Sequence, residues 1–161
     1  MITIIVAIDQ NNGIGKDNKL LCYLPNDFKH FKQMTNGGTV IMGRKTYDSL
    51  PNGALPNRRN IVISRQKDLQ LANCEVFNSL SDAFAACTSD EKVFIMGGEN
   101  VYFQTIENAD CLEITKIDSR FDADAFFPVI DEAIWEVGKE EKHLADEKHK
   151  YNYSFITYKR R

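Results

Sequence analysis

The sequence predicts one α/β domain over residues 1–161, with a mixed, mostly parallel, twisted sheet of about eight strands, four flanking helices and an antiparallel C-terminal strand. Two observations carry this prediction. Short runs that are apolar on both faces, such as Ile2–Ile8 and Thr39–Met42, are typical of central strands and alternate with helical segments. After Phe127–Pro128, polar and apolar residues alternate, as they do in antiparallel or edge strands.

The first third of the chain carries three predicted elements. Ile2–Ile8 is a strand, and the polar stretch Asp9–Asn18 after it is long enough to be a functional loop. A helix begins at Pro25, because proline needs no N–H acceptor in the first turn, and ends near Asn36–Gly38. Thr39–Met42 is the second buried strand.

The remaining elements follow the same logic of apolar runs and glycine or proline stops. We expect a short helix after Gly43 that ends by Pro51, strands at 60–64 and 75–77, a helix at 79–87 capped by Ser79 or Ser81, a strand at 92–96, a helix at 99–107, a strand at 111–117, and strands at 135–137 and 151–158.

Composition excludes several classes of protein. The net charge of −3 with mixed signs gives no electrostatic case for nucleic acid or an anionic membrane. The four cysteines are widely spaced, which is unlike a zinc site or a disulfide scaffold and favours reduced thiols in a cytoplasmic protein. Met1–Ile8 lacks a basic segment and is predicted as a strand, not a signal peptide, and no apolar run is long enough to span a bilayer.

The helix that starts at Pro25 carries an acidic residue in an unusual place. Leu24, Phe28, Phe31 and Met34 fall on one side of it, and Asp27 lies inside that apolar stripe. Asp27 is either a first-turn acid favoured by the helix dipole, with its carboxylate half in water, or a buried acid that needs a partner. The helix alone leaves both interpretations open.

Two strand-to-helix turns are candidate phosphate sites. The turn at Gly43–Thr46 places two cations beside a glycine and a helix start, and Gly97–Gly98 permits close approach of a ligand. Ser64–Arg65 ends a third strand and adds another cation. The alternative for the Gly43 turn and for Arg65 is an ordinary turn with solvated charges, and for Gly97–Gly98 it is helix–sheet packing that merely tolerates glycine. Parallel strands bring such turns to one edge, which suits an extended phosphate-bearing ligand.

Other catalytic motifs are absent. The first strand leads to Gly13-Ile14-Gly15 without a third glycine opening a helix, so a standard dinucleotide-binding domain is disfavoured. His30, His143 and His149 have no metal-ligand spacing, and we expect them at the surface and no metal site. No nucleophile–base arrangement can be assembled from the spacing of serines, cysteines and histidines.

Several blocks of the sequence, in the same order and across nearly the whole chain, resemble the dihydrofolate reductase family. They are Ile4–Ala7, Asn12–Gly15, Leu24–Lys32, Val40–Thr46, Leu55–Arg58, Met96–Gly98, Ile114–Ile117 and Phe127–Pro128. The resemblance implies reduction of 7,8-dihydrofolate to tetrahydrofolate with NADPH, in support of one-carbon metabolism. It also implies binding of antifolate inhibitors such as trimethoprim or methotrexate. A monomer is expected.

The resemblance also implies roles for individual residues. Asp27, with Thr115 as its hydrogen-bonding neighbour, would be the catalytic acid that pairs with the pterin. Arg58, and less strongly Lys32, would hold the carboxylate of the glutamate tail. The apolar walls of the substrate site would be Ile5, Leu24, Phe28, Phe31 and Leu55.

For the cofactor, the resemblance implies a larger set of contacts and a cis Gly97–Gly98 bond. Residues 13–21 would form a mobile loop that closes over the site. The implied cofactor residues are Ala7, Gly13, Ile14, Gly15, Leu20, Gly43, Arg44, Lys45, Thr46, Ser64, Arg65, Met96, Gly97, Gly98, Glu99, Asn100, Val101 and Tyr102. Glu99 is unusual there, since it brings negative charge near the expected pyrophosphate, and we expect its side chain to point away.

One departure from the family pattern stands beside the catalytic helix. The family usually has Pro-Trp where this chain has Leu21-Cys22. Cysteine is smaller than tryptophan and a weak donor, so the water near the substrate and the fit of antifolates are expected to change. Two rival functions remain: a riboflavin-pathway pyrimidine reductase of similar fold, and a nucleotide- or folate-binding protein without turnover.

Overall fold

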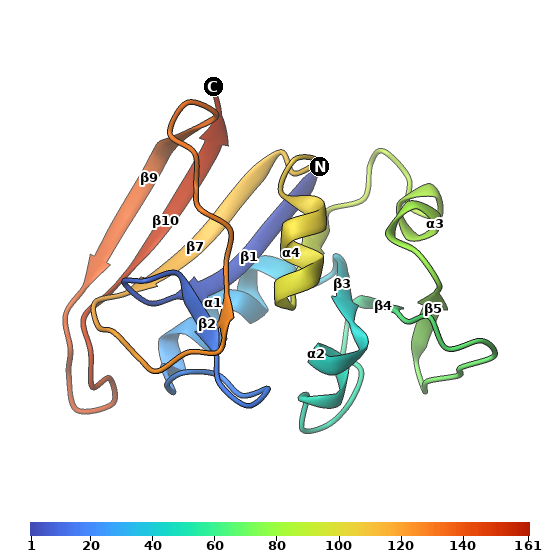
Figure 1. The fold of residues 1–161 in the computed structure, drawn as a ribbon, viewed down its shortest axis with the longest axis horizontal. Coiled ribbons are helices and arrows are strands. Elements are labelled where there is room, and N and C mark those ends of the chain that lie inside the picture. The colour runs from blue at the N-terminus through green and yellow to red at the C-terminus, as the bar shows by residue number, and fades with distance from the viewer.

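The computed structural model describes residues 1–161, and eight of its strands form one sheet (Figure 1). These strands are β1 (Ile2–Ile8), β3 (Thr39–Gly43), β4 (Arg59–Ile63), β5 (Cys74–Phe77), β6 (Val93–Ile95), β7 (Cys111–Ile117), β9 (Trp135–His143) and β10 (Tyr153–Arg160). Their order is β5-β4-β3-β6-β1-β7-β10-β9.

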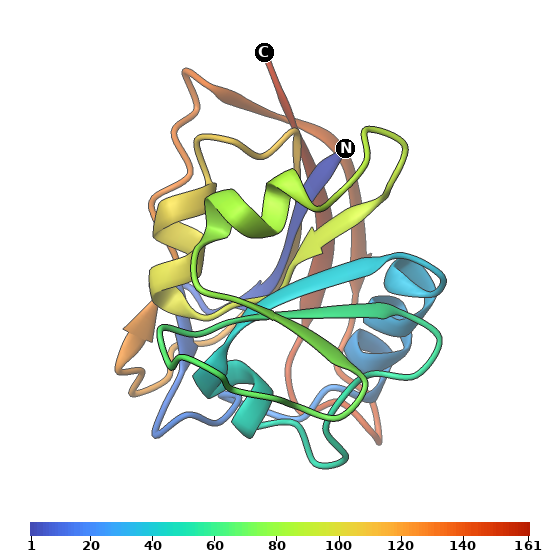
Figure 2. The same ribbon diagram turned by 90° about the vertical axis from the view of Figure 1, so that its right-hand side faces the viewer.

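The pairing confirms the predicted fold class. Every pair from β5 to β7 is parallel, whereas β10 runs antiparallel to both β7 and β9. Strand β9 is much longer than the predicted 135–137. The prediction was too short because most side chains of β9 are exposed at the sheet edge and show no apolar alternation. Strand β1 starts at the end of the molecule that holds both termini (Figure 2). Since β6 and β7 run parallel to β1, the carboxyl ends of these central strands lie at the opposite end.

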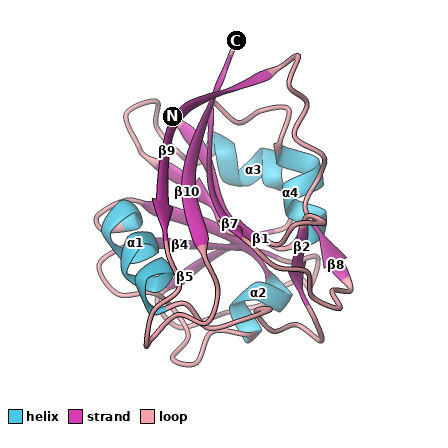
Figure 3. Ribbon diagram, turned by 90° about the vertical axis from the view of Figure 1, so that its left-hand side faces the viewer, coloured by secondary structure: helices cyan, strands magenta, loops and turns pink.

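Four helices cover the two faces of the sheet: α1 (Pro25–Thr35), α2 (Arg44–Asp48), α3 (Leu80–Ala85) and α4 (Glu99–Thr105). Helix α1 lies on one face and α3 and α4 on the other (Figure 3). Alternate residues of β1 separate the two cores: Ile4 packs in the cluster that includes α4, and Ile5 in the cluster that receives Phe31 of α1. Ser79 caps α3, as predicted, by accepting the Asp82 N–H at 3.1 Å.

The predicted polar loop after β1 contains a strand that the sequence did not indicate. Strand β2 (Gly13–Gly15) pairs antiparallel with β8 (Ala125–Phe126) in a separate two-stranded sheet. Gly13 is required there, because a Cβ at this position would lie 2.6 Å from the Cβ of Ala123. The partner strand is more than a hundred residues away, so local turn composition concealed the pairing.

The expectation that all three histidines lie at the surface was wrong for His149. Its side chain is 2% exposed and bonds to both Asp146 and the backbone of Asn26. His30 and His143 are half-buried. No group of three or more His, Cys, Asp or Glu side chains is arranged to hold a metal ion. No helix has the length and apolar character needed to cross a membrane.

Candidate active site

Asp27 lies in the first turn of α1 and faces the sheet. Its Oδ1 accepts a hydrogen bond of 2.5 Å from the hydroxyl of Thr115, which lies on β7 opposite Ala7 of β1. Its Oδ2 accepts no hydrogen bond from the protein. Every buried side-chain polar atom in the structure has a partner, so the unpaired Oδ2 is not a buried atom. This oxygen is therefore open to a ligand or to water.

Burial raises the pKa of Asp27 above its ordinary value, while the Thr115 hydroxyl and the nearby His30 act in the opposite direction. The carboxylate in turn raises the pKa of the Tyr102 phenol, which burial has already raised. The hydroxyl of Tyr102 donates to the carbonyl of Ile5 at 2.9 Å, so it is held inside the core. Of the acids near α1, Asp27 is the one whose half-buried carboxylate lines an apolar pocket and keeps an unfilled acceptor, as functional acids often do.

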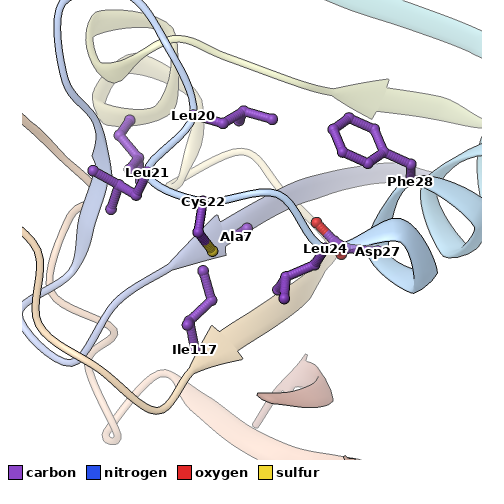
Figure 4. A pocket seen from close by; sticks show the side chains of 9 residues that line it. Ala7, Leu20, Leu21, Cys22, Leu24, Asp27, Phe28 and Ile117 are labelled. Carbon is purple, nitrogen blue, oxygen red and sulfur yellow. The ribbon is translucent and has the colours of Figure 1, made fainter. Parts of the chain in front are cut away.

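A pocket beside Asp27 is otherwise apolar (Figure 4). The ends of β1 and β7 provide its floor, and the segment that enters α1 provides its wall. The lining residues are Ala7, Ile14, Leu20, Leu21, Cys22, Leu24, Asp27, Phe28 and Ile117. Leu20 and Phe28 are 61% and 46% exposed, so the pocket has an apolar rim that is accessible to a ligand.

Apart from Phe28, the predicted apolar wall residues belong to two core clusters on this face of the sheet. Ile5 is buried, and Phe31 and Leu55 pack against its cluster together with Met96. Leu24 is buried in a second cluster that also contains Ile117 and receives Ala7 and Cys22. The predicted walls are therefore brought together on the face of the sheet that α1 covers.

Arg58 follows this apolar region at the C-terminal end of α1. Its Nη1 donates to Thr35 Oγ1 at 3.1 Å and its Nε donates to the carbonyl of Pro56 at 2.9 Å. Burial lowers the pKa of Arg58, yet an arginine remains charged at neutral pH. It makes no ion pair with any carboxylate, and neither does Lys32, which is exposed.

The two glycine turns meet at the carboxyl ends of β3 and β6. The Gly43 N–H donates to the carbonyl of Gly97 at 2.8 Å, and the Gly97–Gly98 bond is cis. A Cβ on Gly97, whose φ is +124°, would lie 3.3 Å from Thr46 Oγ1. The backbone of one turn thus faces the hydroxyl of the other, and the two turns form one continuous surface.

The cations around these turns differ in their partners. Arg44 is paired with Asp48 at 2.9 Å, whereas Lys45 and Arg65 are exposed and make no ion pair. Ser64 Oγ accepts the N–H of Gln66 at 3.2 Å. Two positive side chains at this edge therefore have no carboxylate to neutralise them.

The predicted residues of α4 are arranged along its first turns. Glu99 accepts the Phe126 N–H of β8 at 2.6 Å, which accounts for the direction of this unexpected acid. Asn100 accepts a hydrogen bond from Gln104, and Val101 is buried against the Gly43 turn. Gly13, Ile14 and Gly15 form β2, which borders the pocket through Ile14.

Comparison with known proteins identifies the family to which this arrangement belongs. The family model for dihydrofolate reductase matches residues 1–160. The chain belongs to the dihydrofolate reductase family. Among curated relatives, the dihydrofolate reductase of Bacillus subtilis (strain 168) is 42% identical over 161 residues, which is 100% of this chain and 95% of the relative. The dihydrofolate reductase of Neisseria meningitidis serogroup B is 44% identical over 160 residues, covering 99% and 98% of the two chains.

A solved structure in the dihydrofolate reductase family has the same fold. The dihydrofolate reductase of Enterococcus faecalis, in complex with NADP(H) and RAB-propyl, superposes with a TM-score of 0.93 and 36% sequence identity. The match covers 99% of this chain and 96% of that one. This agreement confirms the predicted fold and the resemblance drawn from the sequence blocks.

Three residues outside the predicted substrate and cofactor sets line the pocket, and two of them, Leu21 and Cys22, stand at the departure from the family pattern noted in the sequence. Leu21, Cys22 and Ile117 line it with Asp27. Ile117 lies two residues after Thr115 on β7, so strand periodicity was a usable signal for it. Burial raises the pKa of the Cys22 thiol, and Asp27 raises it further. Cys22 is thus a neutral thiol beside the carboxylate at neutral pH.

Proposed function

We propose that this chain catalyses the NADPH-dependent reduction of 7,8-dihydrofolate to tetrahydrofolate. As a member of the dihydrofolate reductase family, it is an NADPH-dependent oxidoreductase. One observation carries the proposal for this chain's own residues: Asp27 is a lone carboxylate in an apolar pocket, bonded to Thr115 through one oxygen and open at the other.

Asp27 has the chemistry needed to hold a pterin. A carboxylate accepts two parallel N–H bonds, and the amino group and adjacent ring nitrogen of a pterin offer such a pair. Thr115 fixes the carboxylate from the opposite side, so its orientation is set before the substrate arrives. Holding negative charge near the pterin favours proton uptake by the ring, which we propose is delivered by water.

The residues at the two glycine turns fit NADPH. The Gly97 turn has no side chain between its backbone and Thr46, and Lys45 and Arg65 have no carboxylate partners. We propose that Thr46 and Lys45 hold the phosphates, and that Ser64 and Arg65 select the 2′-phosphate of NADPH. Bound NADPH supplies the hydride that the protein itself lacks. Ala7 and Ile14 would bound the nicotinamide side of the pocket.

The tail of the substrate would extend along α1 to Arg58. This guanidinium has no acidic partner, and its contacts with Thr35 and Pro56 hold it in place for a carboxylate. The apolar side chains Phe28, Phe31 and Leu55 lie between Asp27 and Arg58 in sequence and border the apolar clusters. This order suits a ligand with a polar head, an aromatic middle and an acidic end.

We further propose a cytoplasmic monomer whose product supports one-carbon metabolism and which binds antifolates such as trimethoprim and methotrexate. The four cysteines are free, in keeping with a reducing compartment. The pterin-like head groups of antifolates match the same carboxylate that we assign to the substrate.

The decisive test is loss of NADPH absorbance on addition of dihydrofolate, with NADH and the ribosylated pyrimidine of the riboflavin pathway as comparisons. We expect turnover with dihydrofolate and NADPH and none with the pyrimidine. Turnover of the pyrimidine alone would assign the chain to the rival reductase. Binding of both ligands without any NADPH loss would make it a binding protein.

A further inference from the structure

A second polar cluster contacts α1 at its first turn, outside the pocket. It consists of Asn26, Asp146, His149 and Tyr153. Asn26 directly precedes Asp27, whereas the other members come from β10 and the connection that leads into it (Figure 3). His149 and Tyr153 are each 2% exposed, whereas Asn26 and Asp146 are exposed, so the cluster reaches from the interior to the surface.

The first turn of α1 has one backbone amide without a main-chain acceptor. Pro25 has no N–H, and the N–H groups of Asp27 and Phe28 both donate to the carbonyl of Leu24, at 3.0 and 3.3 Å. Leu24 occupies the N-cap position and offers no side-chain acceptor. The amide of Asn26 instead donates to Nε2 of His149 at 3.0 Å. A histidine 123 residues away thus caps the helix.

The contacts of His149 determine the tautomer of its neutral ring. Because Nε2 faces an N–H donor, it must carry a lone pair, so the proton of the neutral ring lies on Nδ1. Nδ1 is 2.8 Å from Asp146 Oδ1, which also accepts the N–H groups of Lys148 and His149. The bond from His149 and the backbone bonds hold the pKa of Asp146 below its usual value. Asp146 therefore stays ionised and selects the Nδ1–H form.

The side chain of Asn26 provides a second attachment to the same region. Its Nδ2 donates to the hydroxyl of Tyr153 at 2.8 Å. The Tyr153 ring lies against His149, with centroids 5.1 Å apart, and against His143 at 5.0 Å. Asn26 is therefore fixed through both backbone and side chain, and Asp27 next to it reaches Thr115 on β7.

We infer that neutral His149 is a positioning residue for Asp27, because it fixes the first turn of α1 from which the carboxylate reaches Thr115. The role of Asp27 in this inference rests on the proposed function. Protonation of His149 would place an N–H against the Asn26 amide and break the cap. Charged and titratable groups surround His149. Asp146, Glu147, Lys148 and Lys150 belong to its own turn, and all four are exposed. Tyr153 comes from β10, His143 and Glu141 from β9 behind it, and Asp27 and His30 from α1.

The first experiment needs no turnover. Nitrogen NMR of the histidine rings in the full chain should show His149 as the Nδ1–H tautomer. As acid is added, the protection of the Asn26 amide from hydrogen exchange, measured against the intrinsic exchange rate at each pH, should fall in step with the change in the His149 ring signals. An Nε2–H tautomer, or an Asn26 amide that does not respond to protonation of His149, would overturn the inference and leave the proposed function unaffected.

The second experiment uses matched variants. We expect His149→Leu to lower kcat by about tenfold with little change in the KM for NADPH, because a small displacement of a catalytic group is costly. His149→Gln retains a neutral acceptor and should stay within about threefold of the native kcat. His143→Gln is the control, since His143 also stacks on Tyr153 but does not bond to α1.

The outcomes of the variants separate the alternatives. Equal losses for His149→Leu and His143→Gln, or a KM for NADPH that rises with the fall in kcat, would make His149 a general packing residue. If the native chain has no turnover, the proposed function fails, whereas the tautomer and the response of the Asn26 amide still test the cap itself.

Discussion

Asp27 combines an unfilled acceptor with a buried environment, and replacing it tests its role directly. We expect Asp27→Asn to fold and to bind NADPH but to lose about 100-fold or more of kcat at neutral pH, since the amide cannot favour proton uptake by the pterin. Steady-state turnover across pH, with cofactor binding measured by fluorescence, checks this. Near-native turnover would remove Asp27 from catalysis. Thr115→Val, which deletes the hydroxyl partner, should show a smaller loss.

The ionised Asp27 carboxylate should also lower the free energy of unfolding. Burial raises the pKa of Asp27, so the folded state binds a proton more readily than the unfolded state. Stability therefore falls as pH rises through the raised pKa, and the cost is absent below the ordinary value for aspartate. Asp27→Asn should accordingly be more stable than the native chain at pH 7, by about 1 kcal/mol, with the difference vanishing in acid. Urea unfolding at the two pH values measures it.

Cys22 lines the pocket with Asp27 as a neutral thiol, so we expect it to influence ligand binding. Cys22→Trp would add an indole donor and fill space, and we expect tighter antifolate binding by about fivefold, the value of one hydrogen bond. Titration with trimethoprim checks this. Cys22→Phe separates the contributions, since it fills space without a donor. If neither variant alters turnover or inhibitor affinity, the thiol does not influence this site.

At the scale of elements, Asp9 anchors the loop that borders the pocket. Its side chain is fully buried, its Oδ1 accepts the N–H groups of Asn11 and Gly13, and its Oδ2 accepts that of Phe121. These bonds tie the end of β1 to β2 and to the segment that follows β7. The loop continues from β2 to Leu20 and Leu21 of the pocket wall, so its starting point is fixed by one carboxylate.

We expect Asp9→Asn to destabilise the fold by about 1–3 kcal/mol, because an amide cannot accept all three N–H bonds and one donor is left unsatisfied. The loop at 13–21 should also become more sensitive to protease. Denaturant unfolding and limited proteolysis check both effects. Asp118→Asn is the matched control, since Asp118 is exposed and bonds only to the Gln10 side chain and should change stability little. Equal effects from both variants would contradict the anchoring role.

Elements with a local signal were predictable from the sequence, and elements that depend on distant partners were not. The apolar runs of β1 and β3 and the proline at the start of α1 specify those elements locally. Asp27 stood out because it interrupts an apolar stripe. By contrast, β2 depends on β8, and His149 depends on an amide in α1, and neither partner leaves a trace in the neighbouring sequence. Asp9 resembled an ordinary loop residue because its three donors are backbone groups.

At the scale of the whole molecule, Arg59 joins the far edge of the sheet to the connection after α3. Its Nε donates to Glu75 of β5 at 2.6 Å, and its Nη1 donates to Glu91 at 2.8 Å. Glu91 also accepts the Thr39 hydroxyl at 2.7 Å. Hydrogen bonds from Arg59 lower the pKa of Glu75, and those from Thr39 and the Thr88 N–H, followed by Arg59, lower that of Glu91.

These carboxylates and Asp27 should give opposite pH dependences. The pKa values of Glu75 and Glu91 in the folded state are below the ordinary glutamate value. Both residues therefore stabilise the fold at pH values above that ordinary value, and this contribution is lost as pH falls through the lowered pKa values.

Arg59→Met should therefore destabilise the chain by about 1–3 kcal/mol at pH 7. This is less than the loss expected for a fully buried ion pair, because Glu75 is half exposed. The difference from the native chain should shrink in acid, whereas the advantage of Asp27→Asn disappears there for the opposite reason. Urea midpoints of the two variants and the native chain at neutral and acidic pH measure both trends. Since the Arg59 side chain bonds to Glu75 and Glu91 and does not line the pocket, kcat should be unchanged where Arg59→Met remains folded. A loss of turnover would show that this edge of the sheet influences the active site.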